Sequence, residues 1–148
     1  MPAIQTNYTD RHSEGRLGAI ADGRHVNARS LTFVGADADA KLPFGIAACF
    51  GDADGECKLD GTIFAGLVIA EQVQDAAIAT NALGHRETVG LMSEGPMWVA
   101  PTVAVAAGDP VHFVATTGAI SNTGGVAIAD AIFETSAAAG DLARVYLK

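Results

Sequence analysis

The residues best suited to chemistry lie in one acidic stretch between two apolar runs. Residues Asp52–Glu56 alternate carboxylates with small residues, and Asp60 follows closely. Clustered carboxylates suit a hard cation such as calcium. A helix-loop-helix calcium loop, however, needs glycine at its sixth position and a bidentate glutamate at its twelfth. Here Gly55 is fourth and Ile63 is twelfth, so the spacing favours a solvated acidic loop over a calcium site.

Two cysteines, Cys49 and Cys57, flank this acidic stretch and could face each other across a hairpin. A structural disulfide is not expected in a reducing cytoplasm. A structural zinc site needs four ligands, which one pair of cysteines does not supply. We therefore expect two buried or half-buried thiols that are reduced in protein made in the cytoplasm.

The remaining reactive residue types show no catalytic spacing. The four histidines, His12, His25, His85 and His112, are scattered and stand in no ligand pattern. No serine lies in the Gly-x-Ser-x-Gly elbow that presents a nucleophile. The chain also lacks a phosphate-binding glycine loop of either common type. The sequence thus predicts a protein that is not an enzyme and that binds neither cofactor nor metal.

Trp98 is the only tryptophan, and it follows Met97 in a strand-like run. Met97 shares its parity with valines, whereas Trp98 shares its parity with alanines and a threonine. A lone strand aromatic is usually core, but tryptophan is also enriched at interface hot spots. Because Trp98 interrupts a face of small residues, we expect it to lie at a protein contact or immediately beneath one.

The elements around these residues read as short strands separated by Gly and Pro turns. Runs rich in β-forming residues at roughly 8–12-residue spacing are typical of a barrel or sandwich. We expect about nine or ten strands, as in a barrel or jelly roll. The predicted fold is all-β: a single-domain antiparallel β-barrel or jelly-roll-like sandwich with a flexible N-terminal arm.

Several local expectations follow from the pattern. Leu17–Ala21 should be a strand closed by an Asp22-Gly23 turn with positive φ at the glycine. The apolar alternation changes parity near Arg29, which predicts a β-bulge or a bend. Pro43–Phe50 and Thr62–Ala70 should pair as a hairpin, with Gly45 and Gly66 at close backbone approaches. The further expected elements are a helix or long loop over Glu71–Leu83, a hairpin tip over Ser121–Gly125 and a half-buried strand over Leu142–Lys148.

Length, charge and hydropathy restrict the number of domains, the class of binding partner and the cellular location. At 148 residues the chain is one domain, with residues 1–15 forming a loose arm, or a strand that pairs with a neighbour, and 16–148 forming the barrel. A net charge of −8 argues against a nucleic-acid partner, which requires a basic face. No window reaches the length of a membrane span, and no secretory signal is present, so we expect soluble protein made in the cytoplasm.

The order of features resembles the structural cement, or decoration, proteins of tailed bacteriophage capsids. The resemblance covers almost the whole chain and rests on three segments: IQTNYTDRHSEGRLGAIADG at the start, GPMWVAPTVAVAAGDPVHFVATTGAI in the middle and AIFETSAAAGDLARVYL at the end. It implies a small β-barrel or jelly roll on the outer face of an icosahedral shell, made in the host cytoplasm. The segment Cys49–Asp60 does not map onto the family pattern.

The implied partners are the major capsid protein and further copies of the same chain, as a homodimer or trimer. The protein would bridge neighbouring capsid subunits and hold the shell against internal pressure. Candidate contact residues are Tyr8, Arg11, Arg16 and Trp98. Two alternatives remain: another virion part, such as a tail or head-completion protein, and a small β-barrel enzyme or sugar-binding module. The few aromatic residues disfavour the sugar-binding module, because sugar sites favour stacked aromatic faces.

Overall fold

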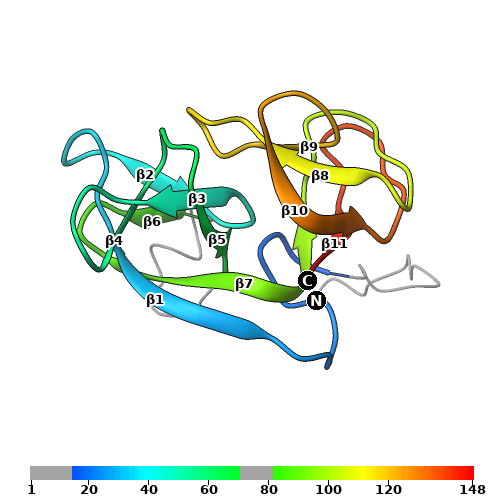
Figure 1. The fold of residues 1–148 in the computed structure, drawn as a ribbon, viewed down its shortest axis with the longest axis horizontal. Helices are drawn as coiled ribbons and strands as arrows, with labels where there is room; N and C mark the ends of the chain where they lie inside the picture. Colours follow the sequence, from blue (N-terminus) through cyan, green and yellow to red (C-terminus); the bar gives the residue numbers. More distant parts are fainter. Residues whose placement is uncertain (1–14, 71–81) are drawn as a thin grey trace, which may run out of the picture.

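The computed structural model describes residues 15–70 and 82–148. Eleven strands and no helix occur within these two ranges (Figure 1). The all-β class expected from the sequence is confirmed. The strands are β1 (Asn27–Phe33), β2 (Lys41–Pro43), β3 (Ala47–Phe50), β4 (Glu56–Lys58), β5 (Phe64–Val68), β6 (Ala82–Gly84), β7 (Thr88–Val99), β8 (Pro110–Phe113), β9 (Ile120–Ser121), β10 (Val126–Phe133) and β11 (Ala143–Leu147). The structure thus has slightly more strands than the nine or ten expected. Four of them, β2, β4, β6 and β9, are only two or three residues long, which is too short to show the alternation of apolar and polar residues.

Five strands close into a barrel, as the sequence predicts. Their order is β1-β4-β3-β5-β7, and β1 also pairs with β7, which completes the ring. The expectation of purely antiparallel pairing is wrong at one place, because β1 and β4 run parallel, with Thr32 opposite Glu56. The chain reaches β4 only after β3, which runs opposite to β4. A separate two-stranded sheet, β2 with β6, lies beside the barrel (Figure 1).

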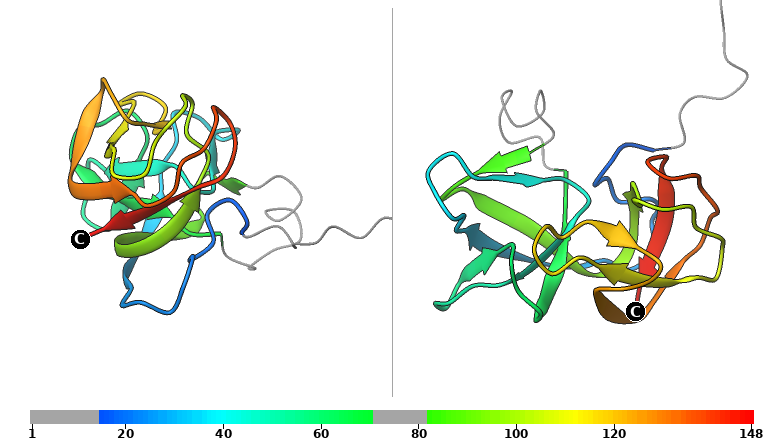
Figure 2. Two further views of the ribbon diagram at one scale, coloured as in Figure 1. Left: turned by 90° about the vertical axis from the view of Figure 1, so that its right-hand side faces the viewer. Right: turned by 90° about the horizontal axis from the view of Figure 1, so that it is seen from above.

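The long strand β7 leaves the barrel and starts a second, curved sheet, here called the outer sheet. Residues Thr88–Glu94 of β7 pair with β1, whereas Gly95–Val99 pair with β11. The outer sheet continues in the order β11-β10-β8-β9. Barrel and outer sheet therefore form two lobes joined by one continuous strand, which Figure 2 shows from two sides.

Each lobe has its own hydrophobic core. One core fills the barrel and includes Phe33, Phe44, Ala48, Cys57, Val89 and Leu91. The other lies between the barrel wall and the outer sheet and includes Cys49, Leu67, Met92, Phe113, Phe133 and Val145. In the part of β7 that pairs with β1, Leu91 belongs to the barrel core and Met92 to the other core, because successive side chains of a strand point to opposite faces. Beyond Gly95, the buried Met97 and Val99 both belong to the second core.

Several local expectations are confirmed. In β11, Ala143, Val145 and Leu147 are buried while Arg144 and Tyr146 are half-buried. Strands β3 and β5 pair antiparallel, although their connection also contains β4. The predicted irregularity near Arg29 lies between Asn27 and Ala28, and the extra residue belongs to β7.

The predicted close approaches of two glycines are also confirmed. Gly45 has φ 73, and a Cβ there would lie 3.1 Å from the Gly18 backbone nitrogen. A Cβ at Gly66 would lie 2.8 Å from that of Leu91 and 2.9 Å from the Met92 carbonyl oxygen. The separations at Gly66 are shorter than those of real Cβ atoms, and the separation at Gly45 is tighter than nearly all real Cβ contacts, so a side chain at either position would push the neighbouring backbone away.

Two local expectations for the segment before β1 are wrong. The segment Leu17–Ala21 forms no strand and contributes one isolated bridge, Ile20 to Met97. Gly23 does not adopt positive φ; the Asp22 carboxylate instead accepts a hydrogen bond from the Arg24 backbone N–H at 3.0 Å. The side chain thus replaces the glycine turn that the sequence suggested.

The predicted hairpin tip over Ser121–Gly125 joins two strands that do not pair with each other. Strands β9 and β10 lie on opposite edges of β8, so this loop passes around the end of β8. Most of the segment Glu71–Leu83 lies outside the described residues, and its last two residues begin β6. Among the described residues, no helix is long and apolar enough to cross a membrane.

Candidate functional site

The acidic stretch forms the turn between β3 and β4 and projects into solvent. The Asp52 side chain is 89% exposed, and its carboxylate lies 2.6 Å from Lys58 Nζ. The Glu56 carboxylate lies 3.9 Å from the Arg86 guanidinium. Over residues 15–70 and 82–148, no group of three or more His, Cys, Asp and Glu side chains could hold a metal ion. The stretch is a solvated loop whose acids are partly neutralised by basic neighbours.

The two cysteines do not face each other, contrary to one sequence expectation. Cys57 lies opposite Phe50 in the ladder, and Cys49 lies opposite Lys58, so the thiols point to opposite faces of the sheet. Cys49 belongs to the core under the outer sheet and Cys57 to the barrel core. Both are buried and unpaired, and burial raises the pKa of Cys57 to about 11 and also raises that of Cys49. Their redox state in the cell remains a prediction.

Two of the three described histidines, His85 and His112, hold loops rather than share a site. The Gly35 backbone N–H donates to His85 Nδ1 at 3.0 Å, next to the barrel. His112 Nδ1 lies 2.8 Å from the Gly124 carbonyl oxygen, at the loop around the end of β8. His12 lies outside the described residues.

Of the candidate contact residues, Trp98 and Arg16 are described, whereas Tyr8 and Arg11 are not. Trp98 is only 7% exposed in the single chain. Gly15 packs directly on its indole, where any Cβ would collide, and the backbones of Gly18 and Ala19 pair with that of Trp98. Trp98 therefore lies immediately beneath the segment that leads to the N-terminal arm. Arg16 is exposed and donates to the Ala70 carbonyl oxygen at 3.3 Å.

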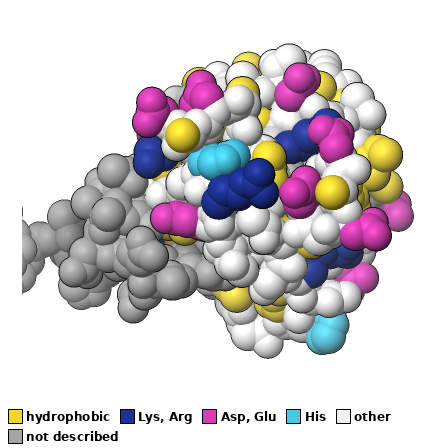
Figure 3. All heavy atoms as spheres, turned by 90° about the vertical axis from the view of Figure 1, so that its left-hand side faces the viewer, with side chains coloured by type: hydrophobic (Ala, Val, Ile, Leu, Met, Phe, Trp, Pro, Cys, Tyr) yellow, Lys and Arg dark blue, Asp and Glu magenta, His cyan; other side chains and the backbone are white. Residues whose placement is uncertain are grey.

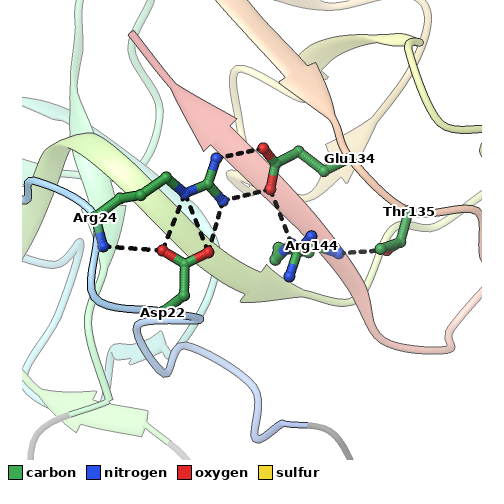
Figure 4. A network of polar contacts seen from close by, with 5 residues as sticks. All are labelled: Asp22, Arg24, Glu134, Thr135 and Arg144. Carbon is green, nitrogen blue, oxygen red and sulfur yellow. Dashed lines mark hydrogen bonds and ion pairs between the residues drawn. The ribbon is translucent and has the colours of Figure 1, made fainter.

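An ion-pair network joins this N-terminal segment to the outer sheet (Figure 4). The Arg24 guanidinium contacts both oxygens of Glu134, at 2.5 and 2.6 Å, and both oxygens of Asp22. Arg144 Nε lies 2.8 Å from the same Glu134 carboxylate. The Arg24 guanidinium also stacks 4.5 Å from the centre of the Tyr146 ring. Paired donors of this kind match a carboxylate in geometry as well as charge.

The network shifts the titration of its carboxyl groups. Hydrogen bonds from the Arg24 side chain, and then from its backbone N–H, lower the pKa of Asp22 to about 2. The Arg24 side chain is also the main cause of the lowered pKa of Glu134, against the opposing effect of burial. Both acids are therefore ionised at neutral pH and hold the chain at Arg24 against β11.

Sequence reasoning missed this network because its members are far apart in the chain. Arg24 and Glu134 are separated by 110 positions, and no local spacing connects them. Only the short motif Asp22-x-Arg24 could have indicated the local half of the network. The contact with Glu134 requires the outer sheet to be in place.

The exposed surfaces of the two lobes differ in charge. Acidic and basic side chains are interspersed over the exposed face of the barrel lobe (Figure 3). The stretch from Gly95 to Ala129, in contrast, contains one charged residue, Asp109. That carboxylate accepts hydrogen bonds from the Ala106 backbone and from Asn122 Nδ2, and the first of these is the main cause of its lowered pKa.

Two loops of the outer-sheet lobe form what we call the charge-poor surface. It consists of the exposed residues of loops 102–107 and 136–140, none of which is charged: Thr102, Val103, Ala104, Ala106, Ala107, Ser136, Ala138, Ala139 and Gly140. The loops are held together by a bridge between Val105 and Ala137 and by the Gly140 N–H, which donates to the Pro101 carbonyl oxygen at 2.8 Å. In Figure 1 they lie side by side at the right-hand end of the molecule.

A cleft of about 390 Å³ opens beside the barrel, between the end of β1 and the acidic loop. Its lining combines Phe33 and Leu59 with Lys41, Lys58 and Asp60. Opposite charges already face each other there. Because the lining carries side chains of both signs and Lys58 already pairs with Asp52, the cleft is not complementary to an ion of one sign.

Two solved structures of phage proteins have a similar fold. A chain from the structure of the capsid of Myoviridae phage XM1 superposes with a TM-score of 0.72, at 17% identity, over 99% of this chain and 98% of that one. The head fibre gp8.5 N base of bacteriophage phi29 superposes with a TM-score of 0.53, at 8% identity, over 84% of this chain and 95% of that one. No curated protein sequence matches significantly.

The sequence also matches one protein family over nearly its full length. That family is described as "Structural cement protein (E217 gp24/Pam3 gp6)", and the match spans residues 4–148. It includes both lobes and the segment with Trp98. The resemblance noted from the sequence is thereby confirmed: the chain belongs to the phage structural cement protein family and is a structural component of the capsid.

Proposed function

We propose that this protein stabilises the phage capsid from its outer face by bridging neighbouring major capsid subunits, and that it makes the contact through the charge-poor surface. Family membership supplies the role as capsid cement. The observation that carries the assignment of the surface is the absence of charge on loops 102–107 and 136–140. Protein interfaces are depleted in charged residues at their centre, because each buried charge must be desolvated.

The charge-poor surface is also rigid enough to bind at low entropic cost. Its loops are tied by the Val105–Ala137 bridge, and the Thr102 N–H donates to the Ile120 carbonyl oxygen at 2.9 Å. The Ala107 N–H donates to Ser136 Oγ at 3.2 Å. Little backbone freedom remains to be lost on association, which favours binding by a surface of small side chains.

The barrel face shown in Figure 3 then remains in solvent. Its mixed charges and the net charge of −8 keep copies on the shell from aggregating with other particles. Synthesis in the host cytoplasm and attachment to the outside of the shell belong to this proposal.

Cementing of this kind needs neither metal nor nucleotide nor catalysis. Once the protein has bound one capsid subunit weakly, its effective concentration near the neighbouring subunit is high, so the second contact forms more readily. Pairing between copies, as a homodimer or trimer, extends the effect over the shell. Arg16 and Trp98 lie where the N-terminal segment meets the outer sheet, and with Tyr8 and Arg11 they are proposed to contribute to these contacts.

The test adds purified protein to undecorated, expanded capsids and measures the temperature at which they disrupt. A ligand that binds only the assembled state stabilises it by mass action, so this temperature should rise until the sites are saturated. Failure to bind, or full binding without any gain in heat resistance, would contradict the proposal.

A matched pair of substitutions tests the surface itself. Ala104→Glu places a charge on the charge-poor surface, whereas Ala38→Glu places the same charge on an exposed loop of the barrel lobe. We expect the first to weaken capsid binding about tenfold or more, which corresponds to about 1.4 kcal/mol, and the second to change it little. Equal effects of the two substitutions would show that another surface faces the capsid.

A further inference from the structure

A groove between the barrel and the outer sheet leaves part of β10 without a partner strand. β10 pairs with β8 at Val126 and Ala127, but it pairs with β11 only at Ile132 and Phe133. Among the described residues, no strand pairs with the second edge of β10 over residues 126–129. Unpaired backbone groups on such an edge form a template for an added strand.

The groove beside this edge has a volume of about 440 Å³ and a mainly apolar lining. Its lining comes from the start of β5, from Ser93 of β7, from β10 and from the end of β11. Ile63 is 69% exposed there, the largest exposure among the exposed large hydrophobic residues of the described chain. The lining residues used below are Ile63, Phe64, Val126, Ile128, Leu147 and Lys148, of which Lys148 is the only charged one.

The N-terminal arm has the composition that this groove requires. Residues 2–9 carry no charged side chain, and Ile4, Thr6 and Tyr8 alternate with smaller or polar residues. Residues of these three types favour strands. An uncharged segment brings no ion of its own to be desolvated in a groove whose lining carries a single charged side chain, Lys148. We propose that residues 2–9 of a second copy of this chain add as a strand to the free edge of β10.

The arm is long enough for this exchange. As a strand, residues 2–9 would span about 26 Å, whereas the free edge over residues 126–129 needs only about 13 Å. Residues 10–14 supply a tether of at most about 17 Å. The five tether residues include Asp10, Arg11 and Glu14, which suit a solvated connection better than the groove.

The position of Gly15 favours exchange between copies over folding back. Gly15 packs on Trp98, which lies opposite Arg144 in the ladder, whereas the groove lies beyond the opposite end of β11, where Leu147 pairs with Gly95. Arg144 and Leu147 are three positions apart on β11 and therefore point to opposite faces of the outer sheet; Gly15 packs on Trp98 at the face of Arg144, whereas Leu147 lines the groove. In a two-fold dimer the exchange is reciprocal, so two arms would fill two grooves.

The exchange concerns contacts between copies and is measured without capsids, although its biological setting rests on the proposed function. Cysteine is introduced in turn at Gln5, Thr6 or Asn7, and separately at Ala127, so that one arm position faces the edge. Each arm variant is mixed with Ala127→Cys and oxidised, and the products are separated without reductant. The matched control replaces Ala127→Cys with Ala38→Cys, another exposed alanine. The native Cys49 and Cys57 are buried.

We expect at least one arm variant to form a disulfide-linked heterodimer with Ala127→Cys, in about tenfold excess over the Ala38→Cys control. A chain that carries both cysteines and closes only on itself, while the mixed single variants do not link, would show folding back and overturn the proposal. Absence of any link, with the β10 edge protected from hydrogen exchange only on capsids, would assign the groove to the capsid subunit and also overturn it.

A second measurement does not depend on the register of the added strand. Ile63→Glu should raise the dissociation constant of the dimer about tenfold or more in sedimentation equilibrium, because it places a charge in the apolar groove. Ala38→Glu and Ala104→Glu should leave it unchanged. An unchanged dimer in Ile63→Glu would overturn the proposal. Loss of capsid binding by Ala104→Glu, which still dimerises, keeps the two proposals separable.

Discussion

The barrel and the outer sheet share a strand and have similar cores, yet their surfaces differ. Each encloses buried aromatic and aliphatic side chains, among them Phe33 in the barrel and Phe133 under the outer sheet. The barrel exposes interspersed acids and bases, whereas loops 102–107 and 136–140 of the outer-sheet lobe expose none. The difference concerns these two loops and not the whole lobe, because Asp130 and Asp141 are exposed elsewhere on it. Charge, rather than core composition, therefore marks the surface that is proposed to make contacts.

The largest expected effect tests whether the two lobes unfold as one domain. Phe33→Ala and Phe133→Ala each empty a fully buried site in one core, and each should lower the free energy of unfolding by about 3–5 kcal/mol. Because β7 serves both cores, we expect either substitution to destabilise both lobes together. Thiol labelling in denaturant measures this directly, since Cys57 reports on the barrel core and Cys49 on the other.

Labelling of the two thiols at the same denaturant concentration is the expected outcome for both variants. If Cys49 becomes reactive in Phe133→Ala while Cys57 stays protected, the barrel is an independent unit. The prediction of one domain over residues 16–148 would then be wrong.

A smaller effect is expected at the contact between the lobes. The Ala47 N–H donates to the Gly118 carbonyl oxygen at 2.9 Å, which joins β3 to the loop before β9. Gly118 has φ 72, and a Cβ there would collide with the Ala47 carbonyl oxygen. Gly118→Ala should therefore cost about 2 kcal/mol or more through backbone strain and the lost close approach.

Chemical denaturation measures the cost of Gly118→Ala, and Gly124→Ala is the matched control. Gly124 also has positive φ, at 69, but nothing lies within 4 Å of a Cβ there. Strain alone would destabilise both variants equally. A larger loss in Gly118→Ala therefore measures the contact between the lobes, and equal losses would show that this contact contributes nothing.

A third, smaller effect concerns pH. The pKa values of Asp22 and Glu134 are lowered in the folded chain, so their pairing with Arg24 stabilises the fold above the unfolded pKa values and is lost as they are protonated. Arg24→Gln should thus lower the unfolding midpoint above about pH 5. The difference from the unsubstituted protein should shrink as pH falls toward 2. Thermal unfolding between pH 2 and 7 measures it, and a difference that does not depend on pH would contradict the electrostatic explanation.

Lys58→Gln is the control in the barrel lobe and should change the unfolding midpoint least. Its partner Asp52 is 89% exposed, and an isolated surface pair is weakened by solvent and salt. We expect no measurable change in the midpoint at any pH in the same series. A loss as large as that of Arg24→Gln would remove the distinction between the isolated pair and the network in which two arginines share Glu134.

The alternation of apolar and polar residues predicted those strands in which pairing determines which neighbouring residues are buried. The alternation of Arg144 and Tyr146 with buried neighbours indicated β11, and the parity change near Arg29 indicated a pairing irregularity. The expectation at Gly23 failed because the Asp22 carboxylate makes the turn instead. The expectation for the loop Ser121–Gly125 failed because turn residues show that the chain reverses but not which strand it then joins.

The sequence by itself determined the all-β class, the family and the uncharged character of the stretch from Gly95 to Ala129, because alternation, turn residues and charge are local properties. Only the tertiary structure decided that β1 joins β4 in parallel, that Cys49 and Cys57 serve different cores, and that Arg24 meets Glu134 across 110 positions. The physical reason is that pairing between distant strands depends on closure of the barrel and packing of the outer sheet against it. The free energy that stabilises this pairing arises only when the whole chain is folded, and no single segment supplies it.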